Sequence, residues 1–240
     1  MLIHIIRQYT KSKAKGKSKL KLTNRLLKIA SLVSENKRLA DIGTDHGYIP
    51  VYLLNEGKIN FAILADINKG PLENARSEDK VDLRLGSGIE VLKKGEVDEV
   101  IIAGMGGILI GELLEANKEV AHSVDKLILQ PMQAQEELRQ YLLNNGYEIL
   151  DECLEKEDFR IYEIIVAKYT GKNTHLEDNI YYEIGKKLIE NKDELLVEFV
   201  ENKIKKYNNI ISKLGNKDTE AVIAKRNLAN ERIEKLKELI

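Results

Sequence analysis

Five short apolar runs, separated by longer amphipathic segments, constrain the fold of this chain more than any other feature. Each run has five or six residues, is rich in Val, Ile and Leu, and is mostly closed by Gly, Asp or Pro. Short runs of this kind are typical of parallel strands that are buried on both faces. Because they alternate with helix-length segments, they predict right-handed βαβ units in a doubly wound α/β sheet. The runs are residues 39–43, 61–66, 81–85, 99–103 and 126–130.

Two further apolar runs follow the last of these strands. Residues 147–154 and 161–169 are separated only by the polar segment 155–160, which is too short to hold a helix. Strands joined so closely pair antiparallel. We therefore expect a Rossmann-like sheet with an antiparallel pair at one edge. The best-marked helix-length segments are 108–117 and 134–145.

The end of the chain has the pattern of a helical hairpin. From Leu196 onward, apolar residues recur at spacings of three and four, as in a coiled-coil seam. The pattern is interrupted once, where Gly215 offers a stop for one helix and Asp218 an N-cap for the next. The sequence thus predicts a coiled-coil domain over residues 173–240, after a cofactor-binding domain over residues 23–172.

The first 22 residues differ in charge from the rest of the chain. They hold seven basic residues and no acid, whereas the remaining residues include 31 bases and 39 acids. Such a run predicts a disordered basic arm over residues 1–22 that could contact nucleic acid or another polyanion. A solvated tail, or residues added by an upstream start codon, fits the pattern equally well.

Composition excludes several classes of protein. With 43% apolar and 32% charged residues, the chain is expected to be ordered and globular. Cys153 is the single cysteine, so it can form neither an internal disulfide nor a thiolate zinc site. We therefore expect a reducing, cytoplasmic location and no bound metal. No apolar run approaches the roughly 20 residues that cross a bilayer, so no membrane is expected among the partners.

The turn after the first predicted strand carries two acids and two glycines. Asp41 and Gly43 end the strand, and Asp45 and Gly47 follow. This spacing differs from the Gly-x-Gly-x-x-Gly that cradles a dinucleotide pyrophosphate, which the two acids would repel. A ligand that carries an ammonium and a sulfonium centre would instead be attracted. S-adenosylmethionine fits that description.

Polar or small residues also end the second and third predicted strands. Asp66 lies 23 residues beyond Gly43, close to the spacing of an acid that accepts ribose hydroxyls. Gly86, Ser87 and Gly88 leave room for a flat base, with the Ser87 hydroxyl available to an adenine edge. Each of these is also common in ordinary turns. Their occurrence on three consecutive strands favours a binding site.

The fourth and fifth strands are followed by segments suited to a planar substrate. Three glycines, at positions 104, 106 and 107, leave main-chain groups open beside the cofactor. A tight turn before a helix explains one such glycine well and three poorly. Gln130 and Pro131 place an amide and a rigid turn at the end of the fifth strand.

Eight short motifs occur together in this chain. They are Arg25-Leu26-Leu27, Asp41-Ile42-Gly43-Thr44-Asp45-His46, Ile49-Pro50, Gly70-Pro71, Arg84-Leu85-Gly86-Ser87-Gly88, Ala103-Gly104-Met105-Gly106-Gly107, Leu129-Gln130-Pro131 and Tyr162-Glu163-Ile164-Ile165. In this combination the chain resembles the bacterial tRNA (adenine(22)-N1)-methyltransferase family. The resemblance implies a Rossmann-like class I methyltransferase sheet, S-adenosylmethionine as cofactor, tRNA as substrate and a coiled-coil C-terminal domain. Ser87 stands where many related methyltransferases have an acid, and Met132 where Asn is common.

The chemistry of methyl transfer, taken with the resemblance, predicts roles for particular residues. Asp45 is expected to stabilise the charge that develops on the methylated base, with His46 as its hydrogen-bonding partner or proton acceptor; both are the expected catalytic residues. His46 fits equally well as a helix cap. The expected cofactor-binding residues are Asp41, Gly43, Thr44, Asp45, His46, Asp66, Ser87, Gly88, Gly104, Met105 and Gly106. The expected substrate-binding residues are Arg25, Gly107, Gln130, Pro131, Lys203, Lys206 and Arg226.

Other functions fit parts of the sequence. A methyltransferase that acts on a protein or a small molecule would need the same cofactor site. A nucleotide-dependent oxidoreductase would need the pyrophosphate loop that is missing here, and an interaction protein with a vestigial site would not need the acids. The net negative charge of the chain beyond residue 22 is unfavourable for RNA binding unless Lys and Arg side chains cluster on one face. The expected oligomeric state is a monomer. Candidates for that cluster are Arg25, Lys28, Lys203, Lys205, Lys206, Lys225 and Arg226.

Overall fold

The computed structural model describes residues 21–44, 47–67, 80–215 and 219–240. The chain forms two compact units, Met1–His175 and Leu176–Ile240. Most of the predicted basic arm lies outside the described residues. Leu22, its last residue, is buried with only 4% of its surface exposed, because it packs into the core of the first unit.

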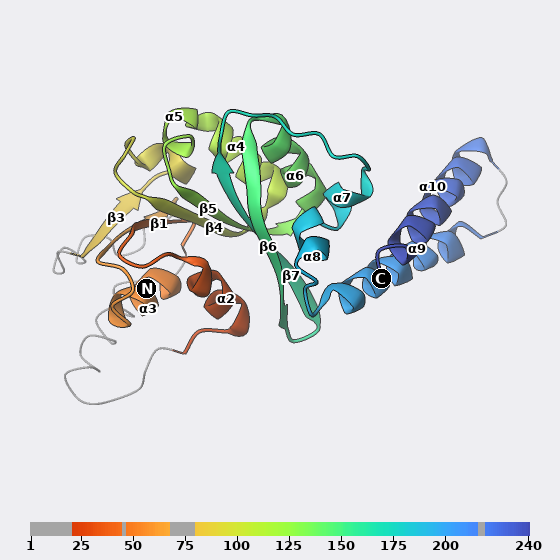
Figure 1. Cartoon of the computed structure of the whole chain (residues 1–240), viewed down its shortest axis with the longest axis horizontal. Coiled ribbons are helices and arrows are strands. Elements are labelled where there is room, and N and C mark those ends of the chain that lie inside the picture. The colour runs from red at the N-terminus through yellow and green to blue at the C-terminus, as the bar shows by residue number, and fades with distance from the viewer. Residues whose placement is uncertain (1–20, 45–46, 68–79, 216–218) are drawn as a thin grey trace. The chain divides into compact units, whose positions relative to one another are not determined.

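The first unit contains a seven-stranded sheet, which confirms the predicted Rossmann-like class (Figure 1). The strand order is β3-β2-β1-β4-β5-β7-β6. Six of these strands run in the same direction, and β7 runs in the opposite direction, between β5 and β6. The first five strands are those predicted from the apolar runs, and the last two form the predicted antiparallel pair at the edge. The strands are β1 (Arg38–Ile42), β2 (Phe61–Asp66), β3 (Val81–Leu85), β4 (Glu99–Gly106), β5 (Lys126–Gln133), β6 (Tyr147–Glu157) and β7 (Arg160–Tyr169).

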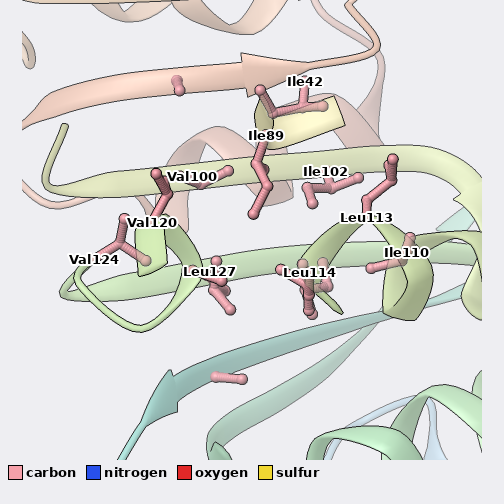
Figure 2. Close-up of a cluster of buried hydrophobic side chains, with 14 of the residues drawn as sticks. Ile42, Ile89, Val100, Ile102, Ile110, Leu113, Leu114, Val120, Val124 and Leu127 are labelled. Atoms are coloured by element: carbon pink, nitrogen blue, oxygen red, sulfur yellow. The ribbon is translucent and has the colours of Figure 1, made fainter. Parts of the chain in front are cut away.

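Helices cover both faces of this sheet, so it has two separate cores. Along β4, Val100 and Ile102 point into one core and Ile101 into the other, as the two-residue period of a strand requires. Figure 2 shows the first of these cores, in which strand residues meet Ile110 and Leu114 of a covering helix. One face carries α2 (Asn24–Leu32) and α3 (Tyr48–Asn55); the other carries α4 (Gly107–Ala116), α5 (Lys118–Ala121), α6 (Gln135–Asn144) and a 3-10 turn (Gly88–Val91).

The structure differs from the sequence prediction at the ends of several strands. β4 and β5 continue to Gly106 and Gln133, beyond the predicted ends. The segment 155–160, predicted as a polar turn, is mostly strand, because β6 and β7 pair as far as Glu157 opposite Arg160. A ribbon of two strands that projects beyond the sheet exposes both faces to water, so its residues are polar even though they form a strand.

The second unit is helical. It contains α7 (Ile180–Glu183), α8 (Lys186–Glu190), α9 (Leu196–Leu214) and α10 (Glu220–Lys237). The start of α9 packs against the end of α10, where the buried residues are Leu196, Phe199 and Val200 on α9 and Ala229, Ile233 and Leu236 on α10. The two helices therefore form the predicted hairpin. Thr219 holds the N-cap position of α10, and the predicted cap, Asp218, lies outside the described residues.

No helix in the described ranges of either unit is long and apolar enough to cross a membrane.

A buried ion cluster joins α6 to the two edge strands. Arg139 of α6 is 1% exposed; its Nε lies 2.6 Å from Glu152 Oε1 on β6, and its Nη2 lies 2.7 Å from Glu163 Oε2 on β7. The two carboxylates hold the pKa of the guanidinium above its usual value. Since each carboxylate is also buried, the cluster depends on Arg139 to balance them.

We predict that Arg139→Met lowers the free energy of unfolding by about 3 to 5 kcal/mol, because it leaves two buried carboxylates without their counter-ion. Urea denaturation measures this change. Lys37→Met is the control, since Lys37 pairs with Asp125 at the surface and its loss should leave the midpoint unchanged. Equal midpoints for the wild type and Arg139→Met would show that the cluster contributes nothing.

Candidate active site

The turns after β1, β2 and β3 are tied together by backbone hydrogen bonds. The amides of Gly43 and Thr44 both donate to the Ala65 carbonyl of β2, at 2.8 and 3.2 Å. The Gly86 amide, just after β3, donates to the Asp66 carbonyl at 3.0 Å. The predicted cofactor residues on these strands thus share one edge of the sheet, the carboxyl edge of the parallel strands, where doubly wound sheets bind their ligands.

Asp41 is a carboxylate buried at this edge, with 6% of its surface exposed. The Thr44 hydroxyl donates a hydrogen bond to it, and the Thr44 oxygen accepts one from the Gly47 amide at 2.9 Å. Burial raises the pKa of the carboxyl from 3.8 to about 7, because water no longer solvates the charged form. Among the described residues, no cationic side chain pairs with Asp41. The surroundings of Asp41 therefore suit a ligand that brings its own positive charge.

Gly43 and Met105 bring the ends of β1 and β4 into contact. Gly43 has a φ of +72°, and a Cβ atom at this position would overlap the terminal methyl of Met105. Any side chain at position 43 would thus be strained by its backbone conformation, and the flexible end of Met105 would have to move aside. Met105 is half-buried and packs on the core. Met105, predicted as a cofactor contact, thus also packs against the turn at Gly43.

The three glycines after β4 have three different environments. Gly104 is exposed with a φ of +82°, and nothing lies within 4 Å of the place where its Cβ would be. Gly106 lies beside Gln133 of β5, and a Cβ on Gly107 would overlap the carbonyl oxygen of Ala134. Only Gly104 is open to a ligand as the sequence predicts. Gly107, expected to bind substrate, is buried because the start of α4 packs on the backbone after β5.

Packing also accounts for the glycines after β3. A Cβ on Gly86 would overlap Val91, and a Cβ on Gly88 would overlap Leu113 of α4. The space that the sequence left for a flat base is, at Gly88, filled by this leucine. Ser87 lies between them and is exposed.

Arg25, Gln130 and Tyr162 form a cluster at the end of β5. Gln130 is fully buried, and its Oε1 accepts a hydrogen bond from Arg25 Nη1 at 2.7 Å. Its Nε2 donates to the carbonyl of Pro131 at 3.1 Å. The Arg25 guanidinium lies 5.3 Å from the centre of the Tyr162 ring. Arg25, rather than the buried Gln130, is thus the group presented at this edge.

Tyr162 has no assigned role in the sequence prediction, although it belongs to a quoted motif. The signal that could have found it is the occurrence of this aromatic residue in a motif of the resemblance, at the start of the predicted strand 161–169. Its ring supports Arg25 by a cation–π contact.

Other predicted site residues lie elsewhere. Asp45, His46 and the Gly70-Pro71 motif lie outside the described residues. In the helical unit, Lys203 Nζ donates to the Glu183 carbonyl at 3.4 Å and lies 5.0 Å from the Phe199 ring centre, while Arg226 donates to the Gly215 carbonyl at 2.8 Å. Lys206 is exposed. Contacts inside the unit therefore account for two of its three predicted RNA-binding residues.

The sheet order, with acids and an open glycine at its carboxyl edge, defines the class of Rossmann-like S-adenosylmethionine-dependent methyltransferases. Residues 22–165 match the methyltransferase-domain family. The chain is 38% identical over 158 residues to the tRNA (adenine(22)-N(1))-methyltransferase of Bacillus subtilis, an alignment that covers 63% of this chain and 66% of that enzyme. It belongs to the tRNA (adenine(22)-N(1))-methyltransferase family.

Solved structures agree with this assignment. The crystal structure of the B. subtilis m1A22 tRNA methyltransferase TrmK matches with a TM-score of 0.81 at 32% identity, over 92% of this chain and 100% of that one. The structure of M. capricolum TrmK in complex with S-adenosyl-homocysteine matches with a TM-score of 0.76 at 29% identity, over 91% and 99% of the two chains. The likeness thus extends over both units.

We predict that Asp41→Asn stabilises the free protein at pH 8 by up to about 4 kcal/mol, since each unit of pKa shift corresponds to about 1.4 kcal/mol, but weakens S-adenosylmethionine binding. The folded carboxyl has the higher pKa, so its penalty to stability builds up from about pH 4 to about 7 and stays in full above that. A cationic ligand needs the charged form. Wild-type affinity should therefore rise with pH up to about 7 and then level off, as measured by calorimetry.

Asp125→Asn is the matched control, because Asp125 is an exposed acid at the opposite edge of the sheet. It should leave both the affinity and its pH dependence unchanged. If Asp41→Asn binds S-adenosylmethionine as tightly as the wild type at pH 8, Asp41 does not meet the ligand's charge.

Proposed function

We propose that this chain transfers a methyl group from S-adenosylmethionine to N1 of adenine 22 in tRNA. The observation that carries the proposal is the buried Asp41 carboxylate, which has no described cationic partner and lies at the carboxyl edge of the sheet. Family membership supports the choice of substrate, since the B. subtilis relative carries that activity in its name.

The cofactor would lie along the carboxyl edge of β1, β2 and β4. Asp41 and the turn at Gly43 would face its charged methionine end, Asp66 at the end of β2 would accept its ribose hydroxyls, and exposed Ser87 would lie near its base. The open face of Gly104 offers room beside it. When bound, S-adenosylmethionine supplies an electrophilic methyl group on a sulfonium sulfur.

The chain's own residues mainly align the adenine. N1 has a lone pair, so attack needs no strong base, but the product is cationic until the exocyclic amine loses a proton. Asp45 is proposed to stabilise that charge, with His46 as its partner or as the proton acceptor. Because N1 is buried in a stacked pair, the base must leave its stack and enter beside Gly104.

Arg25 and the end of β5 would border the adenine on the other side. Gln130 uses its amide oxygen to hold Arg25, so in this proposal it is a positioning residue. Lys205, Lys206 and Lys225 are exposed on the helical hairpin and remain candidates for phosphate contacts. A monomeric state and a cytoplasmic location stay predictions.

The function is tested by incubating the full chain with labelled S-adenosylmethionine and a tRNA transcript, then digesting the product to nucleosides. We expect the label in 1-methyladenosine. A matched transcript with guanine in place of adenine 22 should gain no label. Label in another nucleoside, or equal labelling of both transcripts, would refute the assigned position. Labelling of protein and not of RNA would favour the competing methyltransferase function.

Two substitutions separate binding from chemistry. Asp66→Ala should weaken S-adenosylmethionine binding by about one to two orders of magnitude, because it removes a charged acceptor of two hydroxyl hydrogen bonds. Asp45→Ala should reduce kcat far more than cofactor affinity if the carboxylate acts on the transition state. Calorimetry and single-turnover assays measure the two effects. Equal losses in both quantities for Asp45→Ala would make Asp45 only a cofactor ligand.

A further inference from the structure

The β6–β7 hairpin extends past the end of β5 on the active-site side of the sheet. β7 pairs antiparallel to β5 with Ile165 opposite Leu129, and β7 begins five residues earlier, at Arg160. Its first residues therefore run beyond Gln130, toward the edge where β1 to β5 end. The tip of the hairpin is thus located on the same side of the sheet as Gly104, beside which the substrate base is proposed to enter.

The tip carries an exposed aromatic residue. Glu157 pairs with Arg160, so the turn consists of Asp158 and Phe159 alone. Phe159 is 83% exposed, more than any other large hydrophobic side chain in the described residues. Turns favour small or polar residues, and an exposed phenylalanine contributes nothing to folding. The geometry of the turn therefore does not explain this residue.

Arg160 stacks on this ring. Its guanidinium carbon lies 5.6 Å from the centre of the Phe159 ring, so the two side chains present adjacent flat surfaces to solvent. The charges at the tip balance, with Lys156 and Arg160 against Glu157 and Asp158. A balanced tip is poorly suited to hold phosphates, whereas an aromatic ring beside a guanidinium is suited to stack on a nucleobase.

The hairpin is anchored below its tip to α2 and to the end of β5. The Arg25 amide donates to Glu157 Oε2 at 3.2 Å, and the Arg25 guanidinium lies over Tyr162 while it donates to Gln130. One residue of α2 thus joins β6, β7 and the end of β5. These contacts hold the hairpin, just below its tip, at the carboxyl edge of the parallel strands.

We propose that Phe159, supported by Arg160, stacks on an unpaired base of the tRNA next to the target adenine. This inference rests on the proposed function and deepens it. The tip would act in substrate recognition, since it holds the RNA while the target base is out of its stack, and it would take no part in the chemistry or in cofactor binding.

The test compares Phe159→Ala with the wild type in steady-state methylation of the tRNA transcript. We expect KM for tRNA to rise about ten-fold, as the loss of one base stack predicts, with an unchanged dependence of KM on salt. Affinity for S-adenosylmethionine should not change, which also shows that the variant is folded. Phe159→Trp should restore the wild-type KM because it keeps a stacking surface.

Leu150→Ala is the matched control, because Leu150 is an exposed apolar residue of the same hairpin, on β6 and away from the tip. It should leave KM unchanged. An unchanged KM for Phe159→Ala in an active enzyme would refute the role of the tip and leave the proposed function standing. A shift in oligomeric state on sedimentation, with no change in RNA affinity, would instead assign Phe159 to a contact between two copies. Failure of the wild type to methylate tRNA would refute both proposals.

Discussion

The burial of one carboxylate is the constraint on which the rest of the site depends. Asp41 is the second-last residue of β1, a strand that is buried on both faces, so water does not solvate the charge of its carboxylate. Among the residues that the structure describes, a hydroxyl from Thr44 is the group that donates to it, and the Thr44 backbone is in turn held by β2. Such an arrangement destabilises the free protein. In the proposed function a cationic ligand would offset this cost, and a loss of stability in favour of binding is common at functional sites.

The sequence predicts the fold well and the site unevenly. All five predicted parallel strands follow from short apolar runs, which are typical of the strands of such a sheet, although β3 at its edge is only half-buried. The helical hairpin follows from its apolar seam. The ion cluster around Arg139 could not be predicted, since its three charges lie on three separate segments and the sequence does not show that these side chains meet. Likewise, residues 155–160 are polar and resemble a loop in the sequence, and only the pairing of β6 with β7 shows that most of them are strand.

Glycines show why the site was harder to predict than the fold. The sequence interprets those after β3 and β4 as space for ligands. In the structure, Gly88 makes room for Leu113, Gly107 for a neighbouring carbonyl, and only Gly104 faces open space. A missing side chain gives the same signal whether a ligand or another part of the chain fills the gap. Contacts between distant segments decide which of the two occurs, and a single sequence does not contain them.

The buried ion cluster has a consequence for the alignment of the edge strands. A two-residue slip between β6 and β7 keeps every side chain on its own face, so apolar packing alone discriminates weakly against it. Glu152 lies opposite Ile165 and Glu163 opposite Leu154, so such a slip would change the offset between the two acids from two residues to none or to four, and the two ion pairs of Arg139 would not fit either spacing in the same way. The cluster thus selects one register of the hairpin, and with that register it fixes how far Phe159 reaches beyond the sheet.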